Sequence, residues 1–236
     1  MKNYLTPKIN NQDIDVFIDG INAARTLFML SNSEKQKAEM VIGVNRGWDQ
    51  SYLKFNEKVK SESFVFGSTY RQNNYFINKW PPSLDKKFRL SLHKTLSTSR
   101  RILIDTLYSY IPEAKKILDN TSIDDFRAKL SFYSLRSNYK NKKQQILCGK
   151  HTDFGLATLN ISDNAEWLET KSGEKSWSRI AINPVQPIIW FGEQITGITD
   201  KGFKPFPHRI SYCKNFDKRE RFGISIFLDL LQKESV

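Results

Sequence analysis

The chain has 236 residues, of which 39% are hydrophobic and 13% aromatic, and this suits one globular domain with a sizeable core. It contains no run of about 18 apolar residues and no apolar leader behind Met1, which argues against a transmembrane or secreted protein, so we expect a cytoplasmic one. Its two cysteines, Cys148 and Cys213, are too few and too far apart for a disulfide framework or a CxxC site.

The formal charge is +12 and the isoelectric point is about 9.6, values compatible with an anionic partner such as nucleic acid. The lysines are scattered, however, and the densest cluster is Lys140, Lys142 and Lys143. No nucleic-acid-binding motif accompanies them. A lysine-rich solvated surface is therefore favoured over a specific polyanion site.

The N-terminal half predicts helices. Apolar residues recur at spacings of three and four from Asp15 to Met40, which is typical of an amphipathic helix with a second one behind it. Gly43 and Gly47 then predict turns between short extended pieces.

A long helix is expected from about Asp85 to Ile111, because its apolar stripe ends just before Pro112, and IPEAKKILDN predicts a short helix after it. His93 lies one position off the stripe and has no partner at metal-ligand spacing. We interpret His93 as a surface or boundary residue.

From Lys129 onward the pattern becomes β. Short runs rich in β-branched and aromatic residues, separated by Gly, Pro, Asn and Asp, predict an antiparallel sandwich or barrel. The runs are KLSFYSLRSNY, QQILCGKHTDFGLATLNI, AEWLETK, SWSRIAI, PIIWFG and ITGITD, followed by two strands that carry His208 and Arg221. We find no internal repeat and no low-complexity linker.

His151 and Asp153 are two residues apart, a spacing that sends both side chains to one face of an extended strand. A second histidine would complete the two-histidine, one-carboxylate triad that binds non-heme Fe(II) and leaves coordination positions open. His208 lies 55 residues beyond Asp153, and Arg221 follows 13 positions later. If there is no metal site, His151 would be an exposed histidine beside Asp153, an aspartate that caps a turn. Arg221 would then be a surface arginine in a charged hairpin.

The string HTDFGLATL, the later His208-Arg209 pair and Arg221 together resemble the Fe(II)/2-oxoglutarate-dependent dioxygenases, and in particular their isopenicillin N synthase-like branch. The strings NRGW, SESFVFGS and NKWPP also resemble stretches of that family. The resemblance implies an α+β, mainly β fold in a single domain over residues 1–236. A double-stranded β-helix, or jelly roll, would span about residues 128–230, with a helical region at about 12–120 packed against it. Of the family's N-terminal Pro-Ile-Asp strand, DIDVFID is at best a remnant.

The resemblance also implies an activity: oxidation of a C–H bond of a small molecule, by hydroxylation, desaturation or cyclisation. Fe(II) would be held by His151, Asp153 and His208, and O2 and 2-oxoglutarate would be consumed, the latter giving succinate and CO2. Arg221 would pair in bidentate fashion with the distal carboxylate of 2-oxoglutarate. The tyrosine that contacts the cosubstrate would be Tyr139, unless Lys140 replaces it.

Two departures from the family pattern leave a second function open. Gly223 takes the serine place of Arg-x-Ser, which removes a hydrogen bond worth on the order of 1 kcal/mol, and Ser225 lies two positions further along. Trp190 begins the string that replaces Asn-x-Gly-Asp, so an indole would narrow one wall of the pocket. An oxidase like isopenicillin N synthase, in which Arg221 holds a substrate carboxylate and no 2-oxoglutarate is used, is therefore the alternative.

A third interpretation is a basic protein that acts on nucleic acid, either a base demethylase with the same triad or a binding module. Such demethylases resemble one another in a second arginine six residues past the first, and here that place holds Phe227. Together with the wording HTDFGLATL, this favours a small-molecule substrate.

Overall fold

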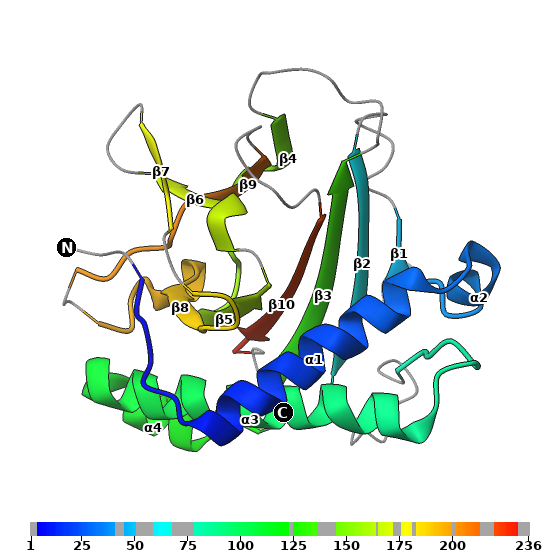
Figure 1. Ribbon diagram of the computed structural model, residues 1–236. Helices are drawn as coiled ribbons and strands as arrows, with labels where there is room; N and C mark the ends of the chain where they lie inside the picture. Colours follow the sequence, from blue (N-terminus) through cyan, green and yellow to red (C-terminus); the bar gives the residue numbers. More distant parts are fainter. Residues whose placement is uncertain are drawn as a thin grey trace.

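The computed structural model describes residues 4–40, 45–50, 59–67, 78–122, 125–135, 145–163, 165–171, 176–180, 183–199, 202–212 and 220–230. These residues form two antiparallel sheets with helices packed against one of them (Figure 1). The expectation of a mainly β chain with helices in its N-terminal half is confirmed.

Two long helices each begin behind an N-capping residue. α1 (Asn11–Met29) begins behind Asn10, whose side chain accepts the backbone N–H of Asp13 at 2.9 Å. α3 (Lys86–Tyr110) begins behind Asp85, whose carboxylate accepts the N–H of Phe88 at 2.7 Å, and it ends before Pro112. Two short helices follow these, α2 (Asn32–Gln36) and α4 (Lys115–Asp119). None of the helices in the described part of the chain has both the length and the apolarity to cross a bilayer.

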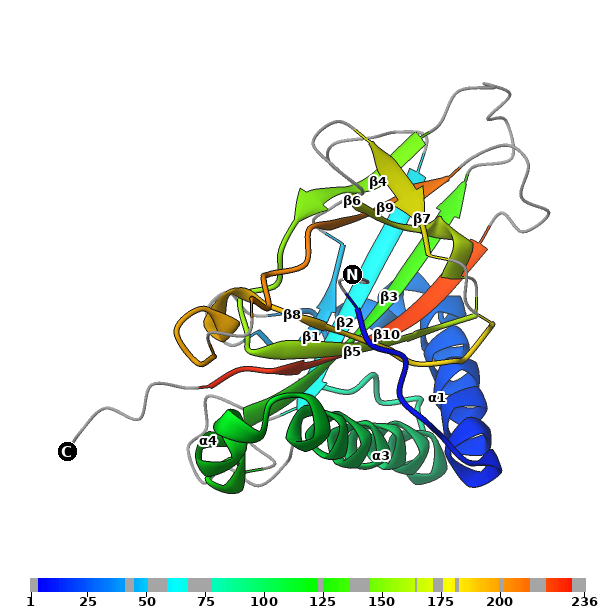
Figure 2. The same cartoon turned by 90° about the vertical axis from the view of Figure 1, so that its left-hand side faces the viewer.

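The six-stranded sheet has the order β1-β2-β3-β10-β5-β8. Its strands are β1 (Gly47–Asp49), β2 (Val59–Gly67), β3 (Phe126–Leu135), β10 (Glu220–Leu228), β5 (Ala157–Ser162) and β8 (Ile188–Phe191). The four-stranded sheet has the order β4-β9-β6-β7. Its strands are β4 (Gln145–His151), β9 (His208–Tyr212), β6 (Leu168–Lys171) and β7 (Trp177–Arg179). Figure 2 shows this second sheet from another side.

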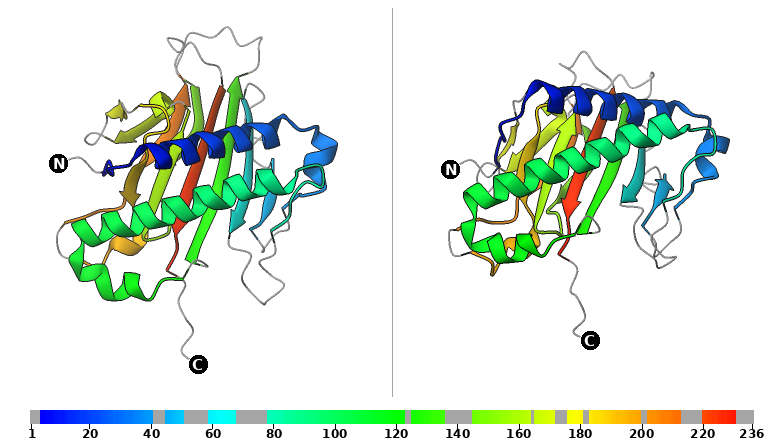
Figure 3. Two further views of the ribbon diagram at one scale, coloured as in Figure 1. Left: turned by 60° about the horizontal axis from the view of Figure 1, so that its bottom comes forward. Right: turned by 90° about the horizontal axis from the view of Figure 1, so that it is seen from below.

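Alternation along β10 separates a helix-covered face from a polar face. Phe222, Ile224, Ile226 and Leu228 are fully or almost fully buried and join one core cluster with residues of α1 and α3. Figure 3 shows both helices lying across the six-stranded sheet. The intervening residues, among them Arg221, point the other way, so this face of the sheet is available for a polar site.

A second, smaller apolar cluster joins the two sheets. It draws residues from β3 and β8 of one sheet and from β6 and β9 of the other, and Trp167 and Phe206 are completely buried in it. The cluster fixes the separation of the sheets next to the polar face of β10. The polar side chains on this face of β10 are thus carried by packed strands rather than by loops alone.

The structure corrects one expected strand, ITGITD, and shows that DIDVFID is not a remnant of a strand. DIDVFID lies inside α1 and is helical, and the extended segment that joins the sheet comes earlier, where Leu5 and Ile189 exchange backbone hydrogen bonds of 2.7 and 2.9 Å. The described residues of ITGITD, 195–199, form no strand: a 3-10 turn at Glu193–Ile195 runs into Gly197, whose φ of +91° is incompatible with an extended strand. The N-terminal region also contributes β1 and β2 to the larger sheet, beside its helices.

Candidate metal centre

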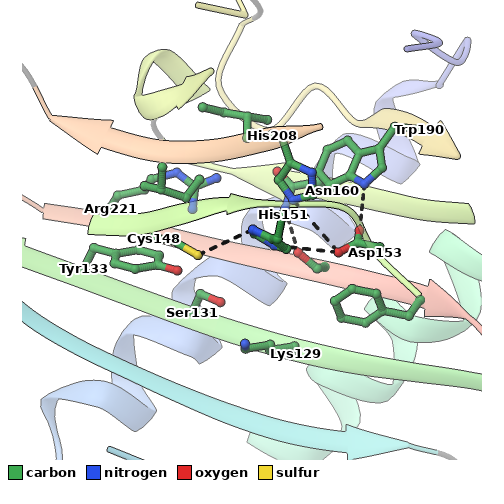
Figure 4. A pocket seen from close by; sticks show the side chains of 14 residues that line it. Lys129, Ser131, Tyr133, Cys148, His151, Asp153, Asn160, Trp190, His208 and Arg221 are labelled. Atoms are coloured by element: carbon green, nitrogen blue, oxygen red, sulfur yellow. Dashed lines mark hydrogen bonds and ion pairs between the residues drawn. The ribbon is translucent and has the colours of Figure 1, made fainter. Parts of the chain in front are cut away.

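Strand register brings the two predicted histidines together. His151 is the last residue of β4 and His208 the first of β9, and the antiparallel ladder pairs them directly. Their ring centroids lie 4.2 Å apart. Asp153 follows β4 by two residues, and its side chain points to the same place (Figure 4). The three predicted residues therefore converge although the sequence separates them widely.

The donor atoms face one another. Asp153 Oδ1 lies 3.9 Å from His151 Nε2 and 4.0 Å from His208 Nε2, and one ligand atom from each residue fits within 4.8 Å. The described residues hold no other cluster of this kind. Ligands about 2.1 Å from one ion at right angles lie roughly 3 Å apart, so the three side chains would close by about 1 Å around a divalent ion. The donor set fits a ferrous ion, which accepts imidazole nitrogen and carboxylate oxygen.

Backbone carbonyls orient both imidazoles. His151 Nδ1 lies 2.9 Å from the carbonyl oxygen of Gly149, and His208 Nδ1 lies 3.0 Å from that of Phe206. A carbonyl can only accept a hydrogen bond, so each Nδ1 carries the proton in this arrangement. Nε2 is therefore the nitrogen that each neutral ring would offer to a metal ion, and in His151 the ion would have to displace a proton from it.

Two donors hold the carboxylate of Asp153, and both contact the same oxygen. Thr158 Oγ1 donates to Oδ2 at 2.5 Å and Trp190 Nε1 donates to it at 2.7 Å. Oδ1, the atom nearest the histidines, is left for the metal ion. The indole of Trp190 was expected to narrow a wall of the pocket; it lines the pocket and also positions Asp153, a role that the sequence did not indicate.

The two histidines differ in protonation. The pKa of His151 is raised to about 9, chiefly because its Nδ1 lies 3.8 Å from Cys148 Sγ. Burial raises the pKa of Cys148, but contacts with His151 and Lys129 outweigh it and the net shift is downward. Burial lowers the pKa of His208, which keeps it neutral, the form that binds a metal ion.

The triad opens into a pocket between the two sheets. It is lined by Lys129, Ser131, Tyr133, Cys148, His151, Asp153, Asn160, Leu168, Trp190, His208, Ile210, Arg221, Ser225 and Phe227 (Figure 4). Arg221 is only 2% exposed, so the interpretation of it as a solvated surface residue is wrong.

Because Gly223 has no side chain, the guanidinium of Arg221 can pack against it. A Cβ on Gly223 would lie 2.7 Å from Arg221 Nη1, so the guanidinium occupies the space that a side chain at this position would take. Ser225 also lines the pocket, and its hydroxyl accepts a hydrogen bond from Asn160 Nδ2 at 2.9 Å. The departure from Arg-x-Ser therefore changes how the arginine is packed without removing it from the pocket.

Tyr139 and Lys140 lie outside the described residues, so the expected cosubstrate contact there remains a prediction. Another tyrosine faces the pocket: Tyr133 stands directly opposite Arg221 in the β3–β10 ladder. Sequence reasoning missed it. The signal was the alternation of Lys129, Ser131 and Tyr133 with the apolar residues Leu130 and Phe132 between them.

His93 lies on α3, away from these side chains. It is half-buried, with its ring against Phe66 at 5.7 Å and Trp80 at 6.0 Å between centroids, and burial lowers its pKa. The interpretation as a boundary residue agrees with this position.

Comparisons with known proteins find relatives by sequence and by fold. No protein-family model matches the chain. Two curated fungal proteins, the 2-oxoglutarate-dependent dioxygenases citB of Monascus ruber and mpl2 of Monascus purpureus, are each 22% identical to it over 182 residues, which is 73% of this chain and 52% of theirs. The chain thus spans about half the length of the curated relatives it matches.

Solved structures resemble the whole fold. A full-length Neurospora crassa protein, in complex with α-ketoglutarate (2-oxoglutarate) and 5-formyluracil, has a TM-score of 0.74 at 18% identity, covering 96% of this chain and 73% of its own. A Caulobacter crescentus protein of the 2OG-Fe(II) oxygenase family has a TM-score of 0.73 at 18% identity, covering 96% and 76%. JOX2, in complex with 2-oxoglutarate, iron and JA, has a TM-score of 0.69 at 15% identity, covering 96% and 67%.

Proposed function

We propose that this chain, which has the fold of the Fe(II)/2-oxoglutarate-dependent oxygenases, is one of them and oxidises a C–H bond of a small molecule while 2-oxoglutarate becomes succinate and CO2. The observation that carries the proposal is the convergence of His151 Nε2, His208 Nε2 and Asp153 Oδ1 at the mouth of a polar pocket. The outcome, whether hydroxylation, desaturation or cyclisation, depends on the substrate.

The two strand orders support the expected jelly roll. In the larger sheet β3, β10, β5 and β8 are neighbours, and in the smaller one β4, β9, β6 and β7 are neighbours. Apart from the β6–β7 hairpin, successive strands from β3 onward thus alternate between the two sheets, as a double-stranded β-helix requires. We place this catalytic core at about residues 128–230 of a single domain over 1–236, with α1, α3, β1 and β2 added to it.

Six residues of the pocket would have a task in this reaction. His151, Asp153 and His208 would hold Fe(II), which supplies the redox chemistry that couples O2 to both substrates. The buried guanidinium of Arg221 would pair with the distal carboxylate of 2-oxoglutarate, and burial strengthens that pairing by excluding water. Tyr133, opposite Arg221, would donate its hydroxyl to the same carboxylate. Trp190 keeps Asp153 oriented.

The alternative, an Fe(II) oxidase that uses no 2-oxoglutarate, is not favoured. Both curated relatives carry the description 2-oxoglutarate-dependent dioxygenase, and the Neurospora crassa protein and JOX2 were solved with 2-oxoglutarate. The other ligands of those two proteins, 5-formyluracil and JA, are small molecules, which supports a small-molecule substrate here rather than nucleic acid.

Turnover and binding test the proposal. Purified protein with Fe(II) and ascorbate should convert 2-oxoglutarate to succinate slowly even without a second substrate, and Asp153→Ala should abolish this. Anaerobic calorimetry should show that 2-oxoglutarate binds, with affinity reduced at least about tenfold in Arg221→Met because a charged hydrogen-bonded pair is lost. Arg25→Met, at an arginine 49% exposed, is the matched control.

Full succinate production by His151→Ala would exclude the proposed metal centre. Absence of 2-oxoglutarate binding by the Fe(II)-loaded wild-type protein would favour the alternative oxidase.

A further inference from the structure

A second cation faces the pocket from β3. Lys129 stands opposite Ser225 of β10, whereas Arg221 stands opposite Tyr133. Lys129 and Tyr133 are four residues apart on one strand face, which corresponds to about 13 Å along the strand. The pocket therefore has two cations at different levels of this ladder, and Figure 4 shows both among its lining side chains.

Both cations share one pocket with the triad. Lys129 and Arg221 line the cavity that His151, Asp153 and His208 also line. Each cation can therefore hold one end of a different ligand whose other end lies at the metal centre. Of the two cations, the proposed function gives only Arg221 a part in binding 2-oxoglutarate.

The surroundings of Lys129 suit an organic anion. Burial is the main factor that lowers its pKa, so a neighbouring anion would offset the desolvation of the ammonium group. Ser131 supplies a hydroxyl between the two cations, and Phe227 lines the same pocket as an apolar wall. The net charge of +12 also favours the approach of anionic ligands.

We propose that Lys129 binds an anionic group of the substrate that is oxidised, so that this substrate is a small organic anion, with a carboxylate as its simplest form. The inference rests on the proposed function, because it assigns the second ligand of the same site. Lys129 is then a specificity-determining residue.

Binding of paired probes tests this. The full chain is loaded with Mn(II), which is redox-inactive here, and 2-oxoglutarate, and is titrated by calorimetry with a series of alkyl and aryl carboxylates, each beside its primary amide. We expect carboxylates to bind at least about tenfold more tightly than their amides. Lys129→Met should abolish this preference, Lys129→Arg should keep most of it, and Lys94→Met, at an exposed position of α3, should keep all of it.

Four results would overturn the inference: no binding of any carboxylate, equal binding of acids and amides, a preference that survives Lys129→Met, or a loss of 2-oxoglutarate affinity in Lys129→Met as large as in Arg221→Met. The last would assign Lys129 to the cosubstrate. Binding of 2-oxoglutarate to the wild-type protein is recorded separately, so failure of the proposed function is distinguished from failure of the inference alone.

Discussion

The carboxylate of Asp153 shows how single atoms define this site. Both of its donors, Thr158 and Trp190, contact Oδ2, and neither contacts Oδ1. A carboxylate fixed through one oxygen offers the other as a monodentate ligand in a fixed direction. The adjoining coordination positions then stay open for ligands other than protein.

Trp190→Phe should therefore weaken metal binding while leaving the fold intact. The phenyl ring keeps most of the buried apolar surface but loses one ring of the indole together with the N–H that donates to Asp153. Loss of such a supporting hydrogen bond typically reduces metal affinity by about 10–100-fold. Competition titration of Mn(II) against a fluorescent chelator would measure the change.

Trp167→Phe is the matched control for that variant. Its indole N–H is also buried but has no hydrogen-bond partner in the described part of the structure, and it lies in the cluster between the sheets. Equal losses of affinity in the two variants would show that ring size, rather than the contact with Asp153, determines metal binding.

At the scale of elements, the contact between α1 and α3 depends on one small residue. A Cβ on Gly20 would collide with Thr95 Oγ1 and approach Ile224 Cδ1 to 3.2 Å. Thr95 is completely buried, and its hydroxyl donates to the carbonyls of Ser91 at 3.0 Å and Val16 at 3.3 Å, so it cannot easily turn away.

Gly20→Ala is accordingly predicted to destabilise the protein. Alanine favours a helix over glycine by about 1 kcal/mol, but overpacking costs about 1–3 kcal/mol, so we expect a net loss of about 1 kcal/mol in the free energy of unfolding. Urea unfolding followed by circular dichroism measures it. Asn22→Ala, exposed on the same helix, should cause no loss, and a stabilised Gly20→Ala variant would contradict the described packing.

These elements also show what the sequence could predict. The long helices follow from apolar spacing and caps, because α1 and α3 each bury one face against a sheet. The triad could be predicted because ligand spacing and residue type are local properties of a strand. DIDVFID was ambiguous because its apolar residues fit both the period of a helix and that of a strand. The N-cap formed by Asn10 begins a helix just before this segment.

Contacts between strands that are distant in sequence could not be predicted. Trp190 reaches Asp153 only because β8 pairs with β5, and Tyr133 faces Arg221 only because β3 pairs with β10 in a particular register. A shift of one residue in either ladder would turn these side chains to the opposite face. The register depends on the pairing of all strands in the sheet, so it cannot be predicted from the sequence of a single strand.

At the scale of the whole molecule, the candidate metal centre connects the two sheets. Both histidines belong to the four-stranded sheet, whereas Thr158 and Trp190, which hold Asp153, belong to β5 and β8 of the six-stranded sheet. An ion bound by all three ligands would therefore join the sheets where the apolar cluster between them ends. Unfolding would have to release this ion.

Metal binding should consequently stabilise the fold through mass action. At a free Mn(II) concentration of about 100 times its Kd, the free energy of unfolding should rise by about 2.7 kcal/mol, provided that the unfolded chain does not bind the ion. Urea unfolding with Mn(II), and again with EDTA, measures this difference. His208→Gln should abolish it because one of three ligands is lost, whereas His93→Gln, on α3, should keep it in full. Equal stabilisation of both variants by Mn(II) would show that the ion binds away from the triad. The gain in stability would then not depend on His151, Asp153 and His208.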